Sequence, residues 1–297
     1  MTLSSTGRGI AYMVASTFIF ALQDTVTRRL ALGNDISVVL MIRYWFFALF
    51  VVAIAMRAPG GIRRVLRPHF PKIQFVRGLL LISQIFLMTF SFVKLGLVAS
   101  HSIAVSFPLM VAALSGPVLG EYVGWRRWTA VAVGAVGILV ILNPGAGVLS
   151  VWSFLPIFGA LSFALYALLT RYVAAKDGSA VSFFWAGITG AVVTTALGLH
   201  SWEPLSPDAW PYMLTLCCTS VAGHWCVIRA YDYAEASAVQ PFSFLQLVWI
   251  MGIGVLFIGE TLTLNMIIGA AIVVSAGLFT LWRAGRKGEA ATPVARP

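Results

Sequence analysis

Charged residues are scarce in this 297-residue chain: they make up 10% of it, whereas soluble domains carry about 25%. Hydrophobic residues account for 60%, and the mean hydropathy is +0.91. A soluble protein of this composition would lack the polar surface that covers a core, whereas lipid solvates the exterior of a membrane protein. The composition therefore predicts an all-α polytopic membrane protein.

Only three cysteines are present, and all of them lie in one apolar stretch. Cys217, Cys218 and Cys226 show no spacing typical of a metal site, and neither do the four histidines. We expect the cysteines to be small buried hydrophobic residues. We expect no metal and no other cofactor.

Enzyme motifs are also missing. The chain has no Gly-x-Ser-x-Gly, no His-Glu-x-x-His and no Gly-Lys-Thr of a phosphate-binding loop. We therefore expect no enzyme and no direct drive by ATP. The net charge of +10 does not indicate a nucleic-acid partner, because most basic residues lie between apolar runs and in the tail, where membrane orientation explains them.

One stretch of the chain recurs in its second half. Residues 20–28 match residues 163–171 at five of nine positions, including Phe-Ala-Leu and Thr-Arg. Gly120-Glu121 and Gly259-Glu260 likewise close two apolar runs, and we expect both glutamates to cap or anchor a loop. The sequence therefore predicts two copies of one membrane-spanning unit. The predicted parts are 1–143, 144–283 and a disordered cytoplasmic tail, 284–297.

Ten apolar segments approach the length of about 20 residues that a membrane-spanning helix needs. Five fall in each half, and because five is odd, the two five-helix repeats must be inverted, an arrangement typical of secondary transporters. A short interfacial helix is predicted at 61–66. The predicted spans are 9–28, 36–56, 75–93, 98–119, 128–143, 152–171, 180–199, 210–229, 238–258 and 263–283.

The basic residues predict the orientation. With both termini in the cytoplasm, 16 Lys and Arg residues lie in inside segments and three lie outside, while Arg43 lies within a span. Such a bias is characteristic of cytoplasmic loops. We therefore predict a multi-pass protein of the inner (plasma) membrane with both termini cytoplasmic.

Charges inside spans point to function, because burying one costs about 2.5–3.5 kcal/mol even on generous scales. Asp24 and Arg43 fall about 6–10 Å below the outer surface of the first two spans, at 1.5 Å per residue. We expect them to pair, either as an outer gate or coupling site or as a static ion pair that makes the burial of both tolerable.

Polar and aromatic residues deep in the spans are candidates for substrate contact. Neutral amides and imidazoles can replace the water shell of a zwitterionic solute, and aromatic rings can wall a pocket. The alternative for each is ordinary hydrogen bonding or packing between helices. The candidates are Gln84, His101, Tyr44, Tyr166, Trp185, His224, Gln246 and Trp249.

Prolines interrupt the fourth and ninth spans and predict bends there. The candidate hinges are Pro108, Pro117 and Pro241, which makes these spans the expected rocking elements. Gly137 and Gly269, in the fifth and tenth spans, predict close helix packing, either within the scaffold or at a dimer contact. Monomer and homodimer both remain open.

These features together resemble the EamA-type branch of the drug/metabolite transporter superfamily, over residues 8–283. The resemblance rests on the two Phe-Ala-Leu openers, on Ser106-Phe107-Pro108 thirteen residues before Glu121, and on Gly259-Glu260 followed by Gly269. One departure is Leu247, where the family commonly has a proline. Family members move amino acids, drugs and small metabolites, and the most similar members are amino-acid exporters, including those of aromatic amino acids.

We therefore expect a secondary transporter that exports neutral, hydrophobic or aromatic amino acids by alternating access. Its expected partners are a small-molecule substrate and the lipid bilayer, with protons as a candidate coupling ion. One alternative is transport of other small metabolites or cationic drugs. A less favoured alternative is a membrane receptor that transports nothing.

Overall fold

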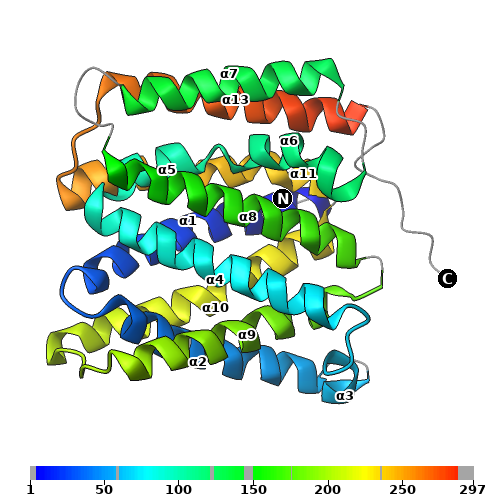
Figure 1. The fold of residues 1–297 in the computed structure, drawn as a ribbon, viewed down its shortest axis with the longest axis vertical. Helices are drawn as coiled ribbons and strands as arrows, with labels where there is room; N and C mark the ends of the chain where they lie inside the picture. The colour runs from blue at the N-terminus through cyan, green and yellow to red at the C-terminus, as the bar shows by residue number, and fades with distance from the viewer. Residues whose placement is uncertain are drawn as a thin grey trace.

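The computed structural model describes residues 5–57, 60–120, 124–143, 150–174, 176–234 and 236–286. Their regular structure is helical, and the long helices lie side by side in one bundle (Figure 1). The elements of the first half are α1 (Ser5–Ala31), α2 (Ile36–Arg57), α3 (Gly61–Val65), α4 (Pro71–Lys94), α5 (Leu97–Ala104), α6 (Phe107–Leu119) and α7 (Trp125–Leu142).

The second half also consists of long and short helices. The ninth span of the chain is divided into four short elements, and the last helix is long. The elements are η1 (Val151–Ser153), α8 (Phe154–Ala174), α9 (Ser179–His200), η2 (Pro207–Ala209), α10 (Trp210–Tyr233), α11 (Ala236–Val239), η3 (Gln240–Phe244), α12 (Leu245–Ile253), the π-helical η4 (Gly254–Ile258) and α13 (Leu264–Arg286).

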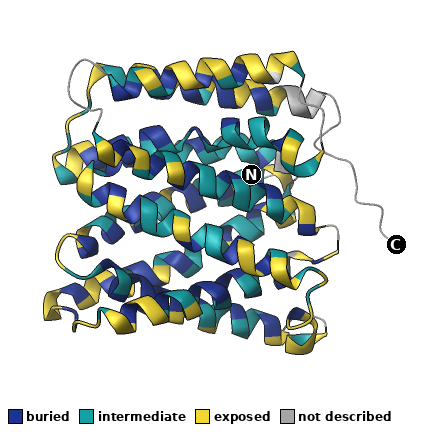
Figure 2. Ribbon diagram, in the orientation of Figure 1, coloured by how far each residue is buried: buried dark blue, intermediate teal, exposed yellow. Residues whose placement is uncertain are grey.

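Nine helical segments among the described residues are long and apolar enough to cross a membrane, and Trp128–Leu142 is a shorter tenth. Exposed residues run along the outer helices (Figure 2), and many of them are large hydrophobic side chains. Leu49, Leu256 and Phe257 are between 71% and 82% exposed. Lipid would solvate these side chains, so the chain is an all-helical, multi-pass membrane protein.

The most extensive helix contacts join the first half of the chain to the second. α1 packs along α10, α2 along α9, α4 along α8, and α7 along α13. The α7–α13 pair forms one edge of the bundle and the α2–α9 pair forms the opposite edge (Figure 1). The start of α1 and the end of α13 lie toward the end of the bundle that carries α3 (Figure 1).

Glycine allows the closest of these contacts. A Cβ atom on Gly269 would lie 2.6 Å from the carbonyl oxygen of Gly137, and one on Gly137 would lie 3.0 Å from the carbonyl oxygen of Gly269. Both distances are too short for a larger residue, so α7 and α13 approach backbone to backbone. The close packing predicted for these glycines is thus confirmed within one chain.

The fourth and ninth spans are interrupted, as predicted, but not at every expected proline. α5 ends at Ala104, and Pro108 lies in the first turn of α6, where its missing N–H is not needed. Pro241 lies in the 3-10 segment η3. Pro117 breaks nothing, because α6 ends at Leu119 and the lost hydrogen bond concerns only its final turns.

Several predicted boundaries shift in the structure. α7 begins at Trp125, and α13 continues to Arg286, into the segment that was predicted to be a disordered tail. The short helix predicted at 61–66 forms over Gly61–Val65, as α3, and its interfacial location remains a prediction. Glu121, the turn at 144–147 and the tail from 287 onward lie outside the described residues.

Candidate functional site

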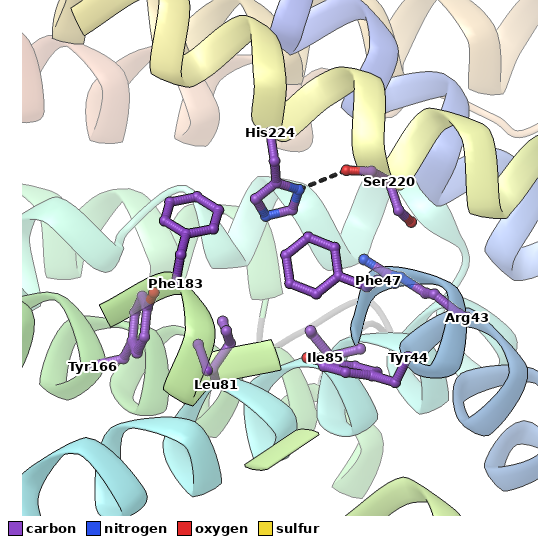
Figure 3. A pocket seen from close by; sticks show the side chains of 10 residues that line it. Arg43, Tyr44, Phe47, Leu81, Ile85, Tyr166, Phe183, Ser220 and His224 are labelled. Atoms are coloured by element: carbon purple, nitrogen blue, oxygen red, sulfur yellow. Dashed lines mark hydrogen bonds between the residues drawn. The ribbon is translucent and has the colours of Figure 1, made fainter. Parts of the chain in front are cut away.

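A pocket lies between α2, α4, α8, α9 and α10 (Figure 3). The cavity measures about 60 Å³, which is room for a few water molecules. Small-molecule sites commonly measure about 300–1,000 Å³, so a ligand of that class would require the cavity to widen. Both halves of the chain contribute to its wall. The lining residues are Arg43, Tyr44, Phe47, Leu81, Ile85, Tyr166, Phe183, Ala186, Ser220 and His224.

Arg43 brings a positive charge to the pocket. The residue is only 8% exposed, and its guanidinium group extends from α2 between Phe47 and Ser220 (Figure 3). It forms no ion pair with any carboxylate in the part of the chain that the structure describes. A buried cation without a partner is costly. A ligand group that carries negative charge or accepts hydrogen bonds would therefore be stabilised here.

His224 presents a hydrogen-bond acceptor to the same space. Its Nδ1 atom lies 2.7 Å from the carbonyl oxygen of Ser220, one turn earlier on α10. Because a carbonyl oxygen can only accept, Nδ1 carries the proton. In the neutral ring Nε2 is then an acceptor, and Figure 3 shows this edge of the ring facing the pocket.

Aromatic rings hold the imidazole and form the pocket wall. The ring centroid of His224 lies 5.0 Å from that of Phe47 and 5.9 Å from that of Phe183. Phe47 also contacts Tyr44, with their centroids 6.2 Å apart. A flat ring of a ligand could stack against such a wall, while its polar edge meets Arg43 and His224.

Behind Tyr166, the pocket is supported by a buried polar network. The guanidinium carbon of Arg77 lies 5.0 Å from the Tyr166 ring centroid, a cation–π contact. The Nε atom of Arg77 donates to Oγ1 of Thr170 at 2.9 Å, and Nη1 donates to Oε1 of Gln74. Arg77 is one of the 16 basic residues predicted to lie in cytoplasmic segments, but its side chain turns inward from α4 and is 1% exposed.

Asp177 completes this network from the loop between α8 and α9. It accepts hydrogen bonds from the backbone N–H groups of His69 and Phe70, at the start of α4, at 2.6 and 3.3 Å. It also accepts one from Nε2 of Gln74 at 2.9 Å. A negative charge at a helix N-terminus is favourable. This carboxylate therefore ties the second half of the chain to the start of α4.

The expected pair of Asp24 and Arg43 does not form. Asp24 Oδ2 instead accepts a hydrogen bond from Nε2 of Gln246 at 3.0 Å and lies 3.1 Å from Nε2 of His101. The contact with His101 is short enough for an ion pair, although its angle is not that of a hydrogen bond. The pairing differs because α1 packs mainly on α10 and α12, so Asp24 faces away from α2.

The structure divides the eight predicted substrate residues into groups. Tyr44, Tyr166 and His224 line the pocket, whereas His101 and Gln246 contact Asp24 instead. The remaining three do not line the pocket. Trp185 donates to the carbonyl oxygen of Val65 on α3, Trp249 donates to Thr17 Oγ1, and Gln84 is half-buried on α4. A role in binding remains a prediction for all eight.

Most of the apolar lining was not predicted. Phe47, Phe183 and Ala186 look like ordinary packing residues in the sequence, where hydrophobic side chains are everywhere. Helical spacing offered one usable signal, because Phe47 follows Arg43 by four residues and so lies on the same face of α2.

Glu260 anchors the interrupted fourth span, as expected of a capping residue. Its two carboxylate oxygens accept hydrogen bonds from the N–H groups of Leu97 and Val98 at the start of α5, both at 2.8 Å. Its Oε1 atom also lies 2.9 Å from Nη1 of Arg28. At Gly96, where φ is +89°, a Cβ atom would lie 3.0 Å from that oxygen, so glycine suits the position.

Comparison with protein families gives a match in the second half of the chain. Residues 150–282 match the model of the EamA-like transporter family, so this part of the chain is similar to that family. The family consists of transporters, so the expectation that the chain is not an enzyme is confirmed.

Curated relatives extend the similarity over nearly the whole chain. An S-adenosylmethionine uptake transporter of Rickettsia prowazekii is 22% identical over 277 residues, 92% of each chain. A riboflavin transporter of Rhizobium johnstonii is 25% identical and covers 92% of this chain and 90% of its own. A riboflavin transporter of Vibrio cholerae is 29% identical over 177 residues, 59% of each chain.

One solved crystal structure shares the fold. It is 18% identical to this chain, with a TM-score of 0.57, and the match covers 95% of this chain and 98% of that one. At this level of identity the likeness concerns the fold alone.

Proposed function

We infer that this chain is a secondary transporter of the EamA-like family, in the drug/metabolite transporter superfamily, and that it carries a small metabolite with a flat aromatic ring. The family match and the whole-length relatives support transport of small metabolites. The prediction of an aromatic ring in the substrate rests on one observation. In the pocket, Arg43, which forms no ion pair among the described residues, and the Nε2 edge of His224 lie beside the rings of Phe47 and Phe183.

The polar groups of the pocket favour a particular ligand edge. Arg43 donates hydrogen bonds and His224 Nε2 accepts one, so carbonyl oxygens next to an N–H group would satisfy both. Riboflavin, which two of the relatives are named for, carries such an edge on an uncharged, flat ring system. A riboflavin-like metabolite is therefore the leading substrate class.

The same pocket disfavours a cationic substrate. None of its lining residues carries a carboxylate, and Arg43 would repel a second positive charge. Cationic drugs are therefore a poor match. S-adenosylmethionine carries sulfonium and ammonium cations, which Arg43 would repel, while its carboxylate and its adenine ring could bind in the pocket.

Export of aromatic amino acids is the second candidate. A carboxylate could pair with Arg43 while the side-chain ring packs on Phe47 and Phe183. The relatives described above are named for S-adenosylmethionine and riboflavin, so they support other small metabolites more than amino acids.

Alternating access between two inverted five-helix repeats is the proposed mechanism. Exchange of the two halves of the chain converts the α1–α10 contact into the α8–α4 contact and leaves the α2–α9 and α7–α13 contacts unchanged. This pattern supports a two-fold relation between the halves. The interrupted fourth and ninth spans are the proposed moving elements, because broken helices can bend with little loss of hydrogen bonding.

The proposed location is the inner membrane with both termini in the cytoplasm. Support comes from the 16 basic residues on the predicted inner side and from the position of the start of α1 and the end of α13 at one end of the bundle (Figure 1). Reporter fusions at the C-terminus test it: a fluorescent protein should fold there and alkaline phosphatase should be inactive. The opposite result would reverse the orientation.

Counterflow in reconstituted vesicles tests the proposed function. Vesicles preloaded with unlabelled riboflavin, tryptophan or S-adenosylmethionine are diluted into the labelled solute, and exchange is expected for riboflavin first. Loss of a charge-assisted hydrogen bond costs about 1.5–3 kcal/mol, so Arg43→Gln should weaken the apparent affinity by about 10- to 100-fold. Arg29→Gln, at an exposed position on α1, is the control. Failure of all three solutes to exchange would remove the proposal, and binding without exchange would indicate a receptor.

A further inference from the structure

We propose that Asp24 and His101 form a proton-binding site, separate from the substrate pocket, that couples transport to a proton gradient. The inference rests on the proposed function, since coupling has meaning only for a transporter. Its basis is the 3.1 Å distance between Asp24 Oδ2 and His101 Nε2, on α1 and α5. Neither residue lines the pocket that contains Arg43.

The surroundings of the pair disfavour a net charge. The two side chains are only 17% and 14% exposed. The ring of Phe92 stacks on His101, with the centroids 5.2 Å apart, and Ala21 and Ile103 belong to the adjoining apolar core. Moving an isolated charge into such an environment is unfavourable. A proton shared by the carboxylate and the imidazole would leave the pair neutral.

The proton count is simple. With one proton bound, the pair is either carboxylate with imidazolium or carboxylic acid with imidazole, and its net charge is zero in both cases. When that proton leaves, a carboxylate and a neutral imidazole remain, with a net charge of −1. Each cycle would therefore take up one proton on one side of the membrane and release it on the other. No other bond is made or broken.

Among the described residues, no charged side chain other than His101 pairs with Asp24. Arg28, one turn further along α1, is occupied by Glu260 at 2.9 Å. η3 and α12 contribute only neutral side chains. The other charged residues and the other histidine on helices packed against α1 and α5 either line the pocket or lie near a helix end. They are Arg43, Arg57, Lys72, Arg77, Lys94, Arg126, Arg127, Arg171, His224, Arg229, Asp232, Arg283 and Arg286.

The position of Asp24 links the proton to the moving elements. His101 belongs to α5, in the interrupted fourth span, and Gln246 belongs to α12, in the interrupted ninth span. Both contact the same carboxylate oxygen. A change in the charge of Asp24 therefore alters its contacts with both broken spans at once. This is a direct physical route from proton binding to a change of conformation.

Transport measurements give the first test, with riboflavin as the probe. In wild-type vesicles an imposed pH gradient should drive accumulation of riboflavin above its equilibrium level. Asp24→Asn and His101→Gln should retain counterflow exchange. Their gradient-driven accumulation of riboflavin should fall at least about tenfold, which corresponds to about 1.4 kcal/mol of lost coupling. Asp208→Asn and His200→Gln, both at exposed positions, should behave as wild type. Gradient-driven accumulation that is unchanged in both pair variants would overturn the proposal while leaving the transport function intact.

A second test needs no substrate. Amide hydrogen exchange of α5 and α12, corrected for the intrinsic rate, is compared at about pH 6 and pH 8, the range in which histidine ordinarily changes charge. The wild-type protein should show a pH-dependent difference in both segments, and Asp24→Asn and His101→Gln should show none. A wild-type protein without that difference, or variants that keep it, would contradict the proposal. Because hydrogen exchange requires no transport, this second test of the proton-binding site remains valid if riboflavin is not a substrate.

Discussion

Replacement of Glu260 by glutamine gives the sharpest test of how the interrupted fourth span is held. The carboxylate accepts two backbone hydrogen bonds at the start of α5 and forms an ion pair with Arg28. Glutamine keeps one acceptor oxygen but removes the charge. One of the two N–H groups of Leu97 and Val98 then loses its partner, and Arg28 is left without a counter-ion.

The magnitude follows from these contacts. A hydrogen bond to a charged group contributes about 1.5–3 kcal/mol. Breaking a buried ion pair by removing one partner costs about 3–5 kcal/mol, and the side-chain exposures of 18% and 14% place this pair near the lower limit. Since glutamine retains part of the cap, we expect the free energy of unfolding to fall by about 2–3 kcal/mol for Glu260→Gln.

Unfolding in mixed micelles with increasing sodium dodecyl sulfate, followed by tryptophan fluorescence, measures this change. Glu203→Gln is the matched control, because Glu203 is exposed in the loop after α9. A second variant, Arg28→Gln, completes a double-mutant cycle in which the combined loss should be smaller than the sum. If Glu260→Gln unfolds at the same detergent concentration as Glu203→Gln, the carboxylate does not anchor α5 and the reasoning is wrong.

Three further variants test other parts of the molecule. Gly137→Val should lower the free energy of unfolding by about 1–3 kcal/mol in the same assay, because the new side chain would meet the backbone of α13. Gly252→Val is the control and should lower it less, because no atom lies within 4 Å of the added Cβ. Arg77→Met should cost about 2–4 kcal/mol by leaving Gln74 and Asp177 without their cation, and a wild-type unfolding curve would refute the network. Phe183→Leu should weaken riboflavin affinity in counterflow about two- to tenfold, since an aromatic contact is worth about 0.5–1.5 kcal/mol, and an unchanged affinity would remove Phe183 from the ring site.

The helices and their interruptions could be predicted from the sequence because they follow from local rules. The apolar runs between charges correspond to the long helices, and Pro108 and Pro241 mark the two broken spans. The role of Glu260 was also accessible, since a glutamate at the end of a span has few groups to bind other than a helix N-terminus or a cation.

The partner of Asp24 could not be predicted in the same way. Counting residues along a span gives depth in the membrane, and by that measure Arg43 is a reasonable partner. Depth does not tell which neighbour a side chain faces, because that depends on how α1 is rotated against α10 and α12. His101 and Gln246, distant in sequence, occupy that side.

Arg77 was misplaced for a related reason. A count of basic residues assigns a cation to one side of the membrane but does not separate a side chain in the headgroup region from one that turns into the bundle. Gln74 lies one turn earlier on the same helix, but only the three-dimensional arrangement brings Thr170 to the guanidinium group of Arg77.

Filling the pocket tests most directly the central claim that the solute crosses through it. Ala186 lines the pocket and is 4% exposed, whereas Ala196, on the same helix α9, is exposed on the outer surface. Riboflavin counterflow is compared for Ala186→Trp and Ala196→Trp, after gel filtration has shown that both variants are folded. We predict that Ala186→Trp abolishes exchange and Ala196→Trp preserves it. Exchange at the wild-type rate in folded Ala186→Trp would contradict the claim.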